Sequence, residues 1–200
     1  SDHLGTYGYT RATTPTLDAL AARALVFEDA SAAAGWTKPS VPSFLTGTYP
    51  CQHGVYEGSA SLGVEAVTDL LPAESLTLAE VFQAHGYRTG AVVNNAHLRA
   101  GNGFEQGFGD YDQGDHDARA IRWRALDWLD QDRSGEPFFL YLHFLDAHWP
   151  YAAPEEWLTR FASAEAIAPF HGRNSRALYE AVNDEQHALS AAERDALVAL

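Results

Sequence analysis

The sequence of 200 residues contains no methionine, one cysteine and one lysine. Its 13 cationic side chains oppose 27 carboxylates, which gives a formal net charge of −14. The single cysteine, Cys51, excludes a disulfide within the chain and a multi-cysteine metal site. The negative charge argues against nucleic-acid binding, because few cations are present to replace the counterions of the phosphate backbone. No run approaches the roughly 18 consecutive apolar residues that a membrane-spanning helix needs.

The residues that are present predict a packed protein. A hydrophobic content of 46%, with 12% aromatic residues, is ample for a core and excludes disorder over the whole chain. Two hundred residues suit one domain or a large part of one, and no linker or repeat divides them. Residues 195–200 end the chain within an apolar helical pattern, so we expect an excerpt of a longer protein. The sequence predicts neither the compartment nor the oligomeric state.

Strand-like and helix-like stretches alternate, which predicts an α/β fold with a mostly parallel sheet. We expect helices over residues 15–25, 37–45, 76–85 and 118–129, and a polar, helical remainder after residue 150. We expect strands over 25–30, 88–93 and 138–144. The last is a continuous apolar run, typical of a central strand covered on both faces. Residues 51–75 and the glycine-rich stretch 101–114 are predicted to be loops.

The first candidate for chemistry is the turn into the helix predicted to start at Thr37. Backbone N–H groups and the helix dipole favour an anion at such a position, so an alkoxide could be stabilised there. The more ordinary interpretation is that Thr37 is a helix N-cap and Pro39 a helix-start residue, because threonine caps are common. From the residues alone, both interpretations stay open.

Three segments resemble one family. They are residues 2–9, Asp-His-Leu-Gly-Thr-Tyr-Gly-Tyr, residues 14–21, Thr-Pro-Thr-Leu-Asp-Ala-Leu-Ala, and residues 46–54, Thr-Gly-Thr-Tyr-Pro-Cys-Gln-His-Gly. Together they look like the start of the sulfatases of the alkaline phosphatase superfamily, and the similarity covers nearly all 200 residues. The resemblance implies a three-layer α/β/α fold that here lacks its first strand and its carboxyl-terminal part. Residues 1–200 would then be a partial catalytic domain.

Two registers of the family's nucleophile segment compete, one starting at Thr37 and one at Ser40. In the family the nucleophile stands nine positions before the threonine that matches Thr46, so the resemblance implies Thr37. Sulfatases of the main type convert a cysteine or serine to formylglycine. This chain has threonine there, and Val41 replaces the arginine of the motif. Relatives with threonine use an unmodified alkoxide, which implies phosphate or phosphonate esters more than sulfate esters.

Three neighbouring positions are candidates for substrate binding. Lys38 is the only lysine and follows Thr37, so it could offer a charge to an anionic substrate, although a lone lysine is more often a solvated surface residue. Asn95 and His97 follow the strand predicted over 88–93, where many sulfatases carry a lysine and a histidine that hold the sulfate. The lysine is missing here, and asparagine could hydrogen-bond an ester oxygen without adding charge.

A fourth candidate, His148, follows the strand predicted over 138–144. Ligands bind at the carboxyl edge of open α/β sheets, and an imidazolium there could bind an anionic ester or protonate a leaving oxygen. The resemblance implies that His148 contacts the transferred group. His143, within the strand, is more often a residue of the core or of the support around a site, and we expect His3 and His53 to be structural.

The resemblance also implies a divalent metal ion, calcium, manganese or zinc, whose identity the sequence does not predict. The family's other ligands come from a pair of aspartates at the end of the first strand and from a later Ser-Asp-His-Gly segment. Neither segment is present, and Asp2 lies too late to belong to the pair. Thr37 is therefore the one metal ligand that we expect in this chain, because such ions need several oxygen or nitrogen donors.

These observations favour a metal-dependent hydrolase of small sulfuric, phosphoric or phosphonic esters, inactive as this fragment alone. Two alternatives remain. One is a transferase of phosphoethanolamine or phosphoglycerol groups, although relatives of that kind carry membrane spans ahead of the catalytic domain. The other is a sulfatase-like protein that binds a ligand without turnover, which the missing arginine and lysine would explain.

Overall fold

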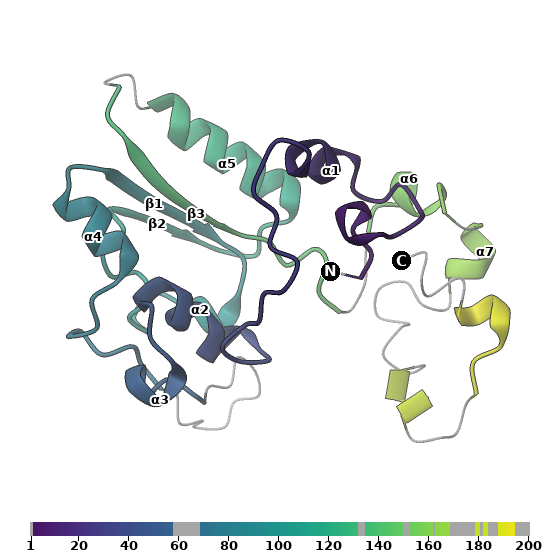
Figure 1. Cartoon of the computed structure of the whole chain (residues 1–200), viewed down its shortest axis with the longest axis horizontal. Coiled ribbons are helices and arrows are strands. Elements are labelled where there is room, and N and C mark those ends of the chain that lie inside the picture. The colour runs from purple at the N-terminus through teal and green to yellow at the C-terminus, as the bar shows by residue number, and fades with distance from the viewer. Residues whose placement is uncertain are drawn as a thin grey trace.

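The structure is a computed structural model that describes residues 2–57, 69–131, 135–149, 153–161, 163–168, 179–180, 182–183 and 188–194. Figure 1 shows a small twisted sheet with helices on both of its sides, and further short helices to the right of it. In chain order the elements are η1 (Gly5–Tyr7), α1 (Pro15–Ala21), α2 (Thr37–Thr46), α3 (Pro50–His53), α4 (Leu78–Ala84), β1 (Arg88–Val93), η2 (Ala96–Leu98), β2 (Asp110–Gln113), α5 (Ala118–Gln131), β3 (Phe138–His143), α6 (Glu155–Leu158) and α7 (Ala164–Ile167).

The three described strands form one parallel sheet in the order β2-β1-β3. The central strand of these three is β1, buried from Thr89 to Val93, whereas β3 lies beside it and is mostly half-buried. The prediction of a central position for 138–144 is therefore wrong within the described sheet. An apolar run predicts burial, but the order of strands depends on long-range pairing that the run does not encode.

The two faces of the sheet are covered by different helices, because successive side chains of a strand point to opposite faces. On one face, Trp128 of α5 packs over Gly90, where an added Cβ would lie 2.6 Å from the indole ring. On the other, Phe82 of α4 stacks on Phe139 with ring centroids 4.7 Å apart. Helix α5 thus covers one face and α4 and α2 the other (Figure 1), which gives the expected three-layer α/β/α arrangement.

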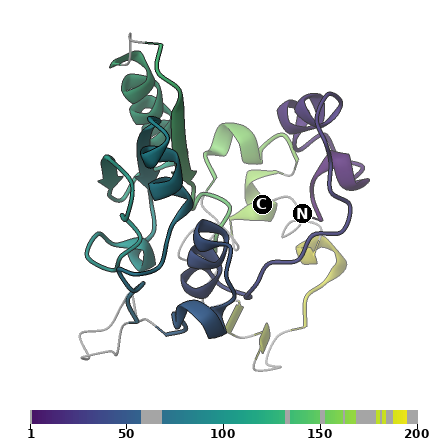
Figure 2. The same cartoon turned by 60° about the vertical axis from the view of Figure 1, so that its left-hand side comes forward.

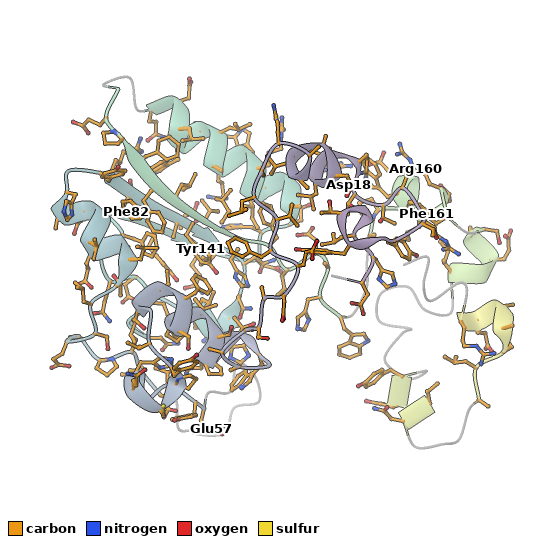
Figure 3. All side chains as sticks on the ribbon, viewed as in Figure 1. Asp18, Glu57, Phe82, Tyr141, Arg160 and Phe161 are labelled. Atoms are coloured by element: carbon orange, nitrogen blue, oxygen red, sulfur yellow. The ribbon has the colours of Figure 1, made fainter. Side chains whose placement is uncertain are left out.

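A buried apolar cluster holds α2 against the sheet. Figure 3 shows Phe82 and Tyr141 on the side of the sheet that faces α4 and α2. The Tyr141 ring packs on this cluster and lies 5.7 Å from the ring of Phe44. Gly47, with φ of +69°, ends α2, and Pro50 starts α3. The cluster comprises Val41, Leu45, Val55, Leu71, Leu98 and Phe104.

Two predictions about the amino-terminal third need correction. Residues 25–30 form no strand, and Leu25 and Phe27 are 82% and 66% exposed, because apolar residues make a strand only where another strand pairs with them. The helix predicted over 15–25 is confirmed, but it ends at Ala21. In the turned view of Figure 2, η1 and α1 stand apart from the sheet and from α4 and α5.

Two predicted loops contain structure. The stretch 101–114 includes β2, a polar strand of four residues that parallel pairing with β1 holds in place. The stretch 51–75 begins within α3, and residues 58–68 lie outside the described residues. Both elements are too short and polar to show a hydrophobic period, which explains why the sequence did not reveal them.

The helical remainder is confirmed where it is described. The short helices α6 and α7 bury Leu158 and Ile167 against each other, with Phe161 packed beside them. The apolar pattern at 195–200 falls outside the described residues. Among the residues that are described, no helix is both long enough and apolar enough to cross a membrane.

Candidate active site

The candidate site lies where the carboxyl ends of β1 and β3 meet the start of α2. Val93 and His143 are register partners at the ends of their parallel strands, so the residues that follow them emerge at the same edge of the sheet. Asn95 lies two residues after the end of β1 and is the N-cap of η2. Such an edge is where α/β folds bind ligands.

Thr37 is the first residue of α2 rather than its cap. The N-cap is Trp36, in an extended conformation, and no side-chain cap bond satisfies the helix start. The interpretation of Thr37 as a simple N-cap is therefore wrong. The half-buried Thr37 begins the first turn, in which its own N–H and that of Lys38 have no carbonyl partner within the helix. Pro39 has no N–H, and the N–H of Ser40 bonds the carbonyl of Trp36. The amide group of Asn95 donates from Nδ2 to Oγ1 of Thr37 across 3.5 Å.

The side chain of Asn95 is buried and its orientation is fixed. Its Oδ1 accepts a hydrogen bond from the backbone N–H of His97 at 2.9 Å, so its Nδ2 is left to face Thr37. The neighbouring Asn94 turns away and donates to the carbonyl of His116 at 2.7 Å. Of the two asparagines, Asn95 is thus the one that contacts Thr37.

Lys38 is buried, with 1% of its surface exposed, which corrects the expectation of a solvated surface lysine. Burial lowers the pKa of its ammonium group, and the charge of Asp69 partly opposes that effect. The Asp69 carboxylate itself accepts hydrogen bonds from the backbone N–H groups of Glu57 at 2.7 Å and Tyr56 at 2.8 Å, and these bonds lower its pKa. The buried side chain of Lys38 thus follows Thr37 at the start of α2, and Asp69 is the carboxylate that favours its charged form.

His97 and His148 approach the same region from different elements. Burial lowers the pKa of the half-buried His97, and the charges of Lys38 and His148 lower it further, so the three groups share one electrostatic neighbourhood. The His97 ring meets Trp36 edge-on, with centroids 5.3 Å apart. His148 is exposed in the turn after β3, and its Nδ1 contacts the carbonyl of Trp149.

His143, which the sequence analysis left open as a residue of the core or of the support around a site, lies in that supporting position. Its Nε2 lies 3.3 Å from Nδ2 of Asn95, and its Nδ1 lies 2.8 Å from the hydroxyl of Tyr141. Burial lowers the pKa of its imidazole. The strand period could have revealed it, because positions 139, 141 and 143 face the same side as α2.

The competing Ser40 lies elsewhere on α2. Its backbone N–H is used by the carbonyl of Trp36, and its side chain lines an open groove of about 560 Å³ along the helix, with Phe44 and Tyr49. Neither Thr37 nor Asn95 lines that groove. The next serine, Ser43, is buried and bonded to Nε2 of His53 at 2.9 Å, which keeps His53 inside the packing of α2 on α3.

Within the part of the chain that the structure describes, no three histidine, cysteine, aspartate or glutamate side chains come together to hold a metal ion. Asp2 is exposed near the amino terminus. The groups at the site that could ligate a metal ion are one hydroxyl, one side-chain amide and imidazole rings. A hard divalent cation prefers several oxygen ligands, so these groups suit it poorly.

The sequence as a whole matches one known family. The model of the Sulfatase family matches residues 1–188. The chain belongs to the sulfatase family. Human arylsulfatase A is 41% identical over 98 residues, which are 49% of this chain and 18% of that protein. The ulvan-active sulfatase of Formosa agariphila is 39% identical over 87 residues, 43% of this chain and 15% of that protein.

Solved structures share the sulfatase fold over the whole chain. A protein solved with its substrate D-glucosamine-2-N,6-O-disulfate is 16% identical and covers 99% of this chain, with a TM-score of 0.65. The phosphonate monoester hydrolase of Agrobacterium radiobacter is 19% identical, also covers 99% and has the same TM-score. The chain spans about half of each, 49% and 52%, so these likenesses show the sulfatase-type fold for that half.

The structure brings together four of the residues that the sequence singled out, Thr37, Lys38, Asn95 and His97. The fifth, His148, lies close enough for its charge to affect His97. Val41, which stands where the motif has arginine, is buried in the apolar cluster beneath α2 and adds nothing polar to the site.

Proposed function

We propose that this chain is part of a hydrolase of small anionic esters, sulfuric, phosphoric or phosphonic, in which Oγ1 of Thr37 is the nucleophile. The observation that carries the proposal is the Asn95 side chain, which donates to Oγ1 of Thr37 at the open start of α2. An N–H donor and a helix N-terminus both stabilise an oxygen that is losing its proton. A threonine needed only to cap the helix would have no use for this arrangement.

The other residues have complementary roles in this proposal. The charge of Lys38 attracts the anionic group, whereas His97, whose lowered pKa favours the neutral imidazole, and Asn95 donate hydrogen bonds to its oxygens without adding charge. Oγ1 of Thr37 releases its proton to solvent water and bonds to phosphorus or sulfur, while the bond to the leaving oxygen breaks and that oxygen takes a proton from His148. Water then attacks the same phosphorus or sulfur, and the bond to Oγ1 breaks. One proton of that water restores the Thr37 hydroxyl, and His148 regains its proton from solvent.

Phosphate and phosphonate esters suit this site better than sulfate esters. The nucleophile position holds threonine, and Val41 lies in the core where the motif has its arginine. An unmodified alkoxide forms a phospho-enzyme that water can hydrolyse, whereas a sulfo-enzyme of the same kind is harder to turn over. We therefore rank phosphoric and phosphonic esters first.

The described residues do not fit a divalent ion by themselves. The hydroxyl of Thr37 is the one hard oxygen donor that we assign to such an ion, and the described residues contain no group of three histidine, cysteine, aspartate or glutamate side chains that could complete the site. The proposal of metal dependence therefore rests on the family and requires ligands beyond the residues that the structure describes. No step above is routed through a metal.

A covalent adduct tests the proposal directly. The full-length protein is incubated with an aryl phosphodiester, quenched in acid and digested, and the peptide that contains residues 37–46 is examined by mass spectrometry. We expect a phosphoryl adduct on Thr37 and hydrolysis of the ester in water. An adduct on Ser40 would overturn the choice of nucleophile. Release of product only when a sugar or lipid acceptor is added would indicate a transferase, and binding without adduct or turnover would indicate a non-catalytic relative.

A further inference from the structure

We infer that His143 is a positioning residue for the nucleophile: together with Tyr141 it holds the Asn95 amide so that one of its N–H groups points at Oγ1 of Thr37. This inference rests on the proposed role of Thr37. The Asn95 side chain contacts both Thr37 and His143 through one nitrogen. Its Nδ2 lies 3.5 Å from Oγ1 of Thr37 and 3.3 Å from Nε2 of His143. These two contacts connect the first residue of α2 with the last residue of β3.

The hydrogen bonds of Asn95 determine which of its two amide atoms is the oxygen and which is the nitrogen. The backbone N–H of His97 is a donor, so the atom facing it must be the oxygen, Oδ1. Both hydrogens on Nδ2 are then free to donate, one to Thr37 and one to His143. With 7% of its surface exposed, Asn95 has little water to replace a lost partner.

The same logic fixes the tautomer of His143. Because Nδ2 of Asn95 donates, Nε2 of His143 must accept and carries no proton. A neutral imidazole then bears its proton on Nδ1, which donates to the hydroxyl oxygen of Tyr141 at 2.8 Å. Burial favours this neutral form, since it lowers the pKa of His143.

Tyr141 is the last residue in this series of hydrogen bonds, and packing against its neighbours fixes its ring. Its ring packs on the core cluster and lies near Phe44 and Phe108, with centroids 5.7 Å and 6.5 Å away. Burial raises the pKa of its phenol to about 12, so the hydroxyl stays neutral at any working pH. The position of Asn95 is therefore set by the packed core and not by solvent.

A spectroscopic test does not depend on activity. The full-length protein is labelled with ¹⁵N-histidine, and long-range ¹H–¹⁵N spectra assign the protonated nitrogen of His143 at neutral pH. We expect the Nδ1–H tautomer in the parent protein. In the Tyr141→Phe variant, which removes the acceptor, we expect a mixture of tautomers. An Nε2–H tautomer in the parent protein would set two donors against each other at Asn95 and would overturn the inference.

A kinetic test separates positioning from structural support. His143→Leu removes the acceptor for Asn95, whereas His143→Gln offers an amide oxygen in its place. We expect kcat to fall on the order of 10- to 100-fold in His143→Leu with a smaller change in KM, and to recover in large part in His143→Gln. Melting temperatures identify any variant that fails to fold, and in that case the tautomer decides.

The matched control repeats His143→Leu in an Asn95→Ala background. If His143 acts through Asn95, the second substitution costs less than twofold there. A full loss in both backgrounds would show a merely structural role and overturn the inference. If the parent protein hydrolyses no ester, the proposed function fails, but the tautomer measurement still decides whether His143 orients Asn95.

Discussion

Asn95 and Thr37 are 58 positions apart in the chain, yet the amide nitrogen of Asn95 lies 3.5 Å from the hydroxyl oxygen of Thr37. The contact joins the loop after the central strand β1 to the first turn of α2. The proposed chemistry depends on it, because a threonine hydroxyl is a weak nucleophile unless its alkoxide form is stabilised.

Asn95 should therefore act as a donor and not as a base. We expect Asn95→Ala to lower kcat on the order of 100-fold, the loss typical of removing one donor to a developing oxyanion. Asn95→Asp keeps the shape but sets a negative charge beside Oγ1 of Thr37, so it should lose more. The measurement is steady-state hydrolysis of an aryl phosphodiester by the full-length protein.

The neighbour Asn94 is the matched control for that prediction. Its side chain bonds the carbonyl of His116 and does not contact Thr37, so Asn94→Ala should keep most of the activity. An Asn95→Asp variant as active as Asn95→Ala or more so would mean that a carboxylate can take the Thr37 proton, against the donor role.

Gly90 should tolerate no side chain. An alanine Cβ there would lie 2.6 Å from the ring of Trp128, so Gly90→Ala must push α5 away from β1. We expect a loss of about 1–3 kcal/mol in the free energy of unfolding, the usual cost of overpacking, measured by denaturant titration. In Gly109→Ala the nearest atom would be 3.4 Å away, so that variant should unfold near the parent midpoint. Equal midpoints for the two variants would contradict the packing of α5 on β1.

The free energy of unfolding should depend on pH in part because His53 is buried in the folded protein. Burial lowers the pKa of His53 in the folded protein below its ordinary value of 6.5, so below that pH the unfolded chain binds the proton more tightly. The free energy of unfolding should therefore fall as the pH drops from 7 to 5. His53→Gln should reduce the slope relative to the parent protein. Identical slopes would mean that His53 keeps its ordinary affinity for protons.

The sequence predicted where most helices and strands lie in the chain better than it predicted how the strands are ordered in the sheet. The apolar run of β1 and the helical periods of α4 and α5 were sufficient, since each element buries its own pattern. The strand expected over 25–30 was wrong, and so was the central place expected for β3 within the described sheet, because both depend on which strand pairs with which.

Some residues of the candidate site were likewise predictable from the sequence and others were not. Thr37, Asn95 and His97 follow short motifs, and the fold brings them together. The burial of Lys38, the charge of Asp69 near it and the link from His143 to Asn95 were not predictable, because each depends on residues that are distant in the sequence. Contacts between distant segments carry no local signal in a single sequence.

The kcat of Thr37→Ala in the full-length, folded and metal-loaded protein, compared with that of Ser40→Ala, tests the central claim most directly. If Oγ1 of Thr37 is the nucleophile, Thr37→Ala should lower kcat by a factor on the order of thousands, and Thr37→Ser should keep a measurable fraction. Ser40→Ala should change kcat little, because its side chain lines a separate groove. Near-normal turnover by Thr37→Ala, or a larger loss in Ser40→Ala, would contradict the assignment.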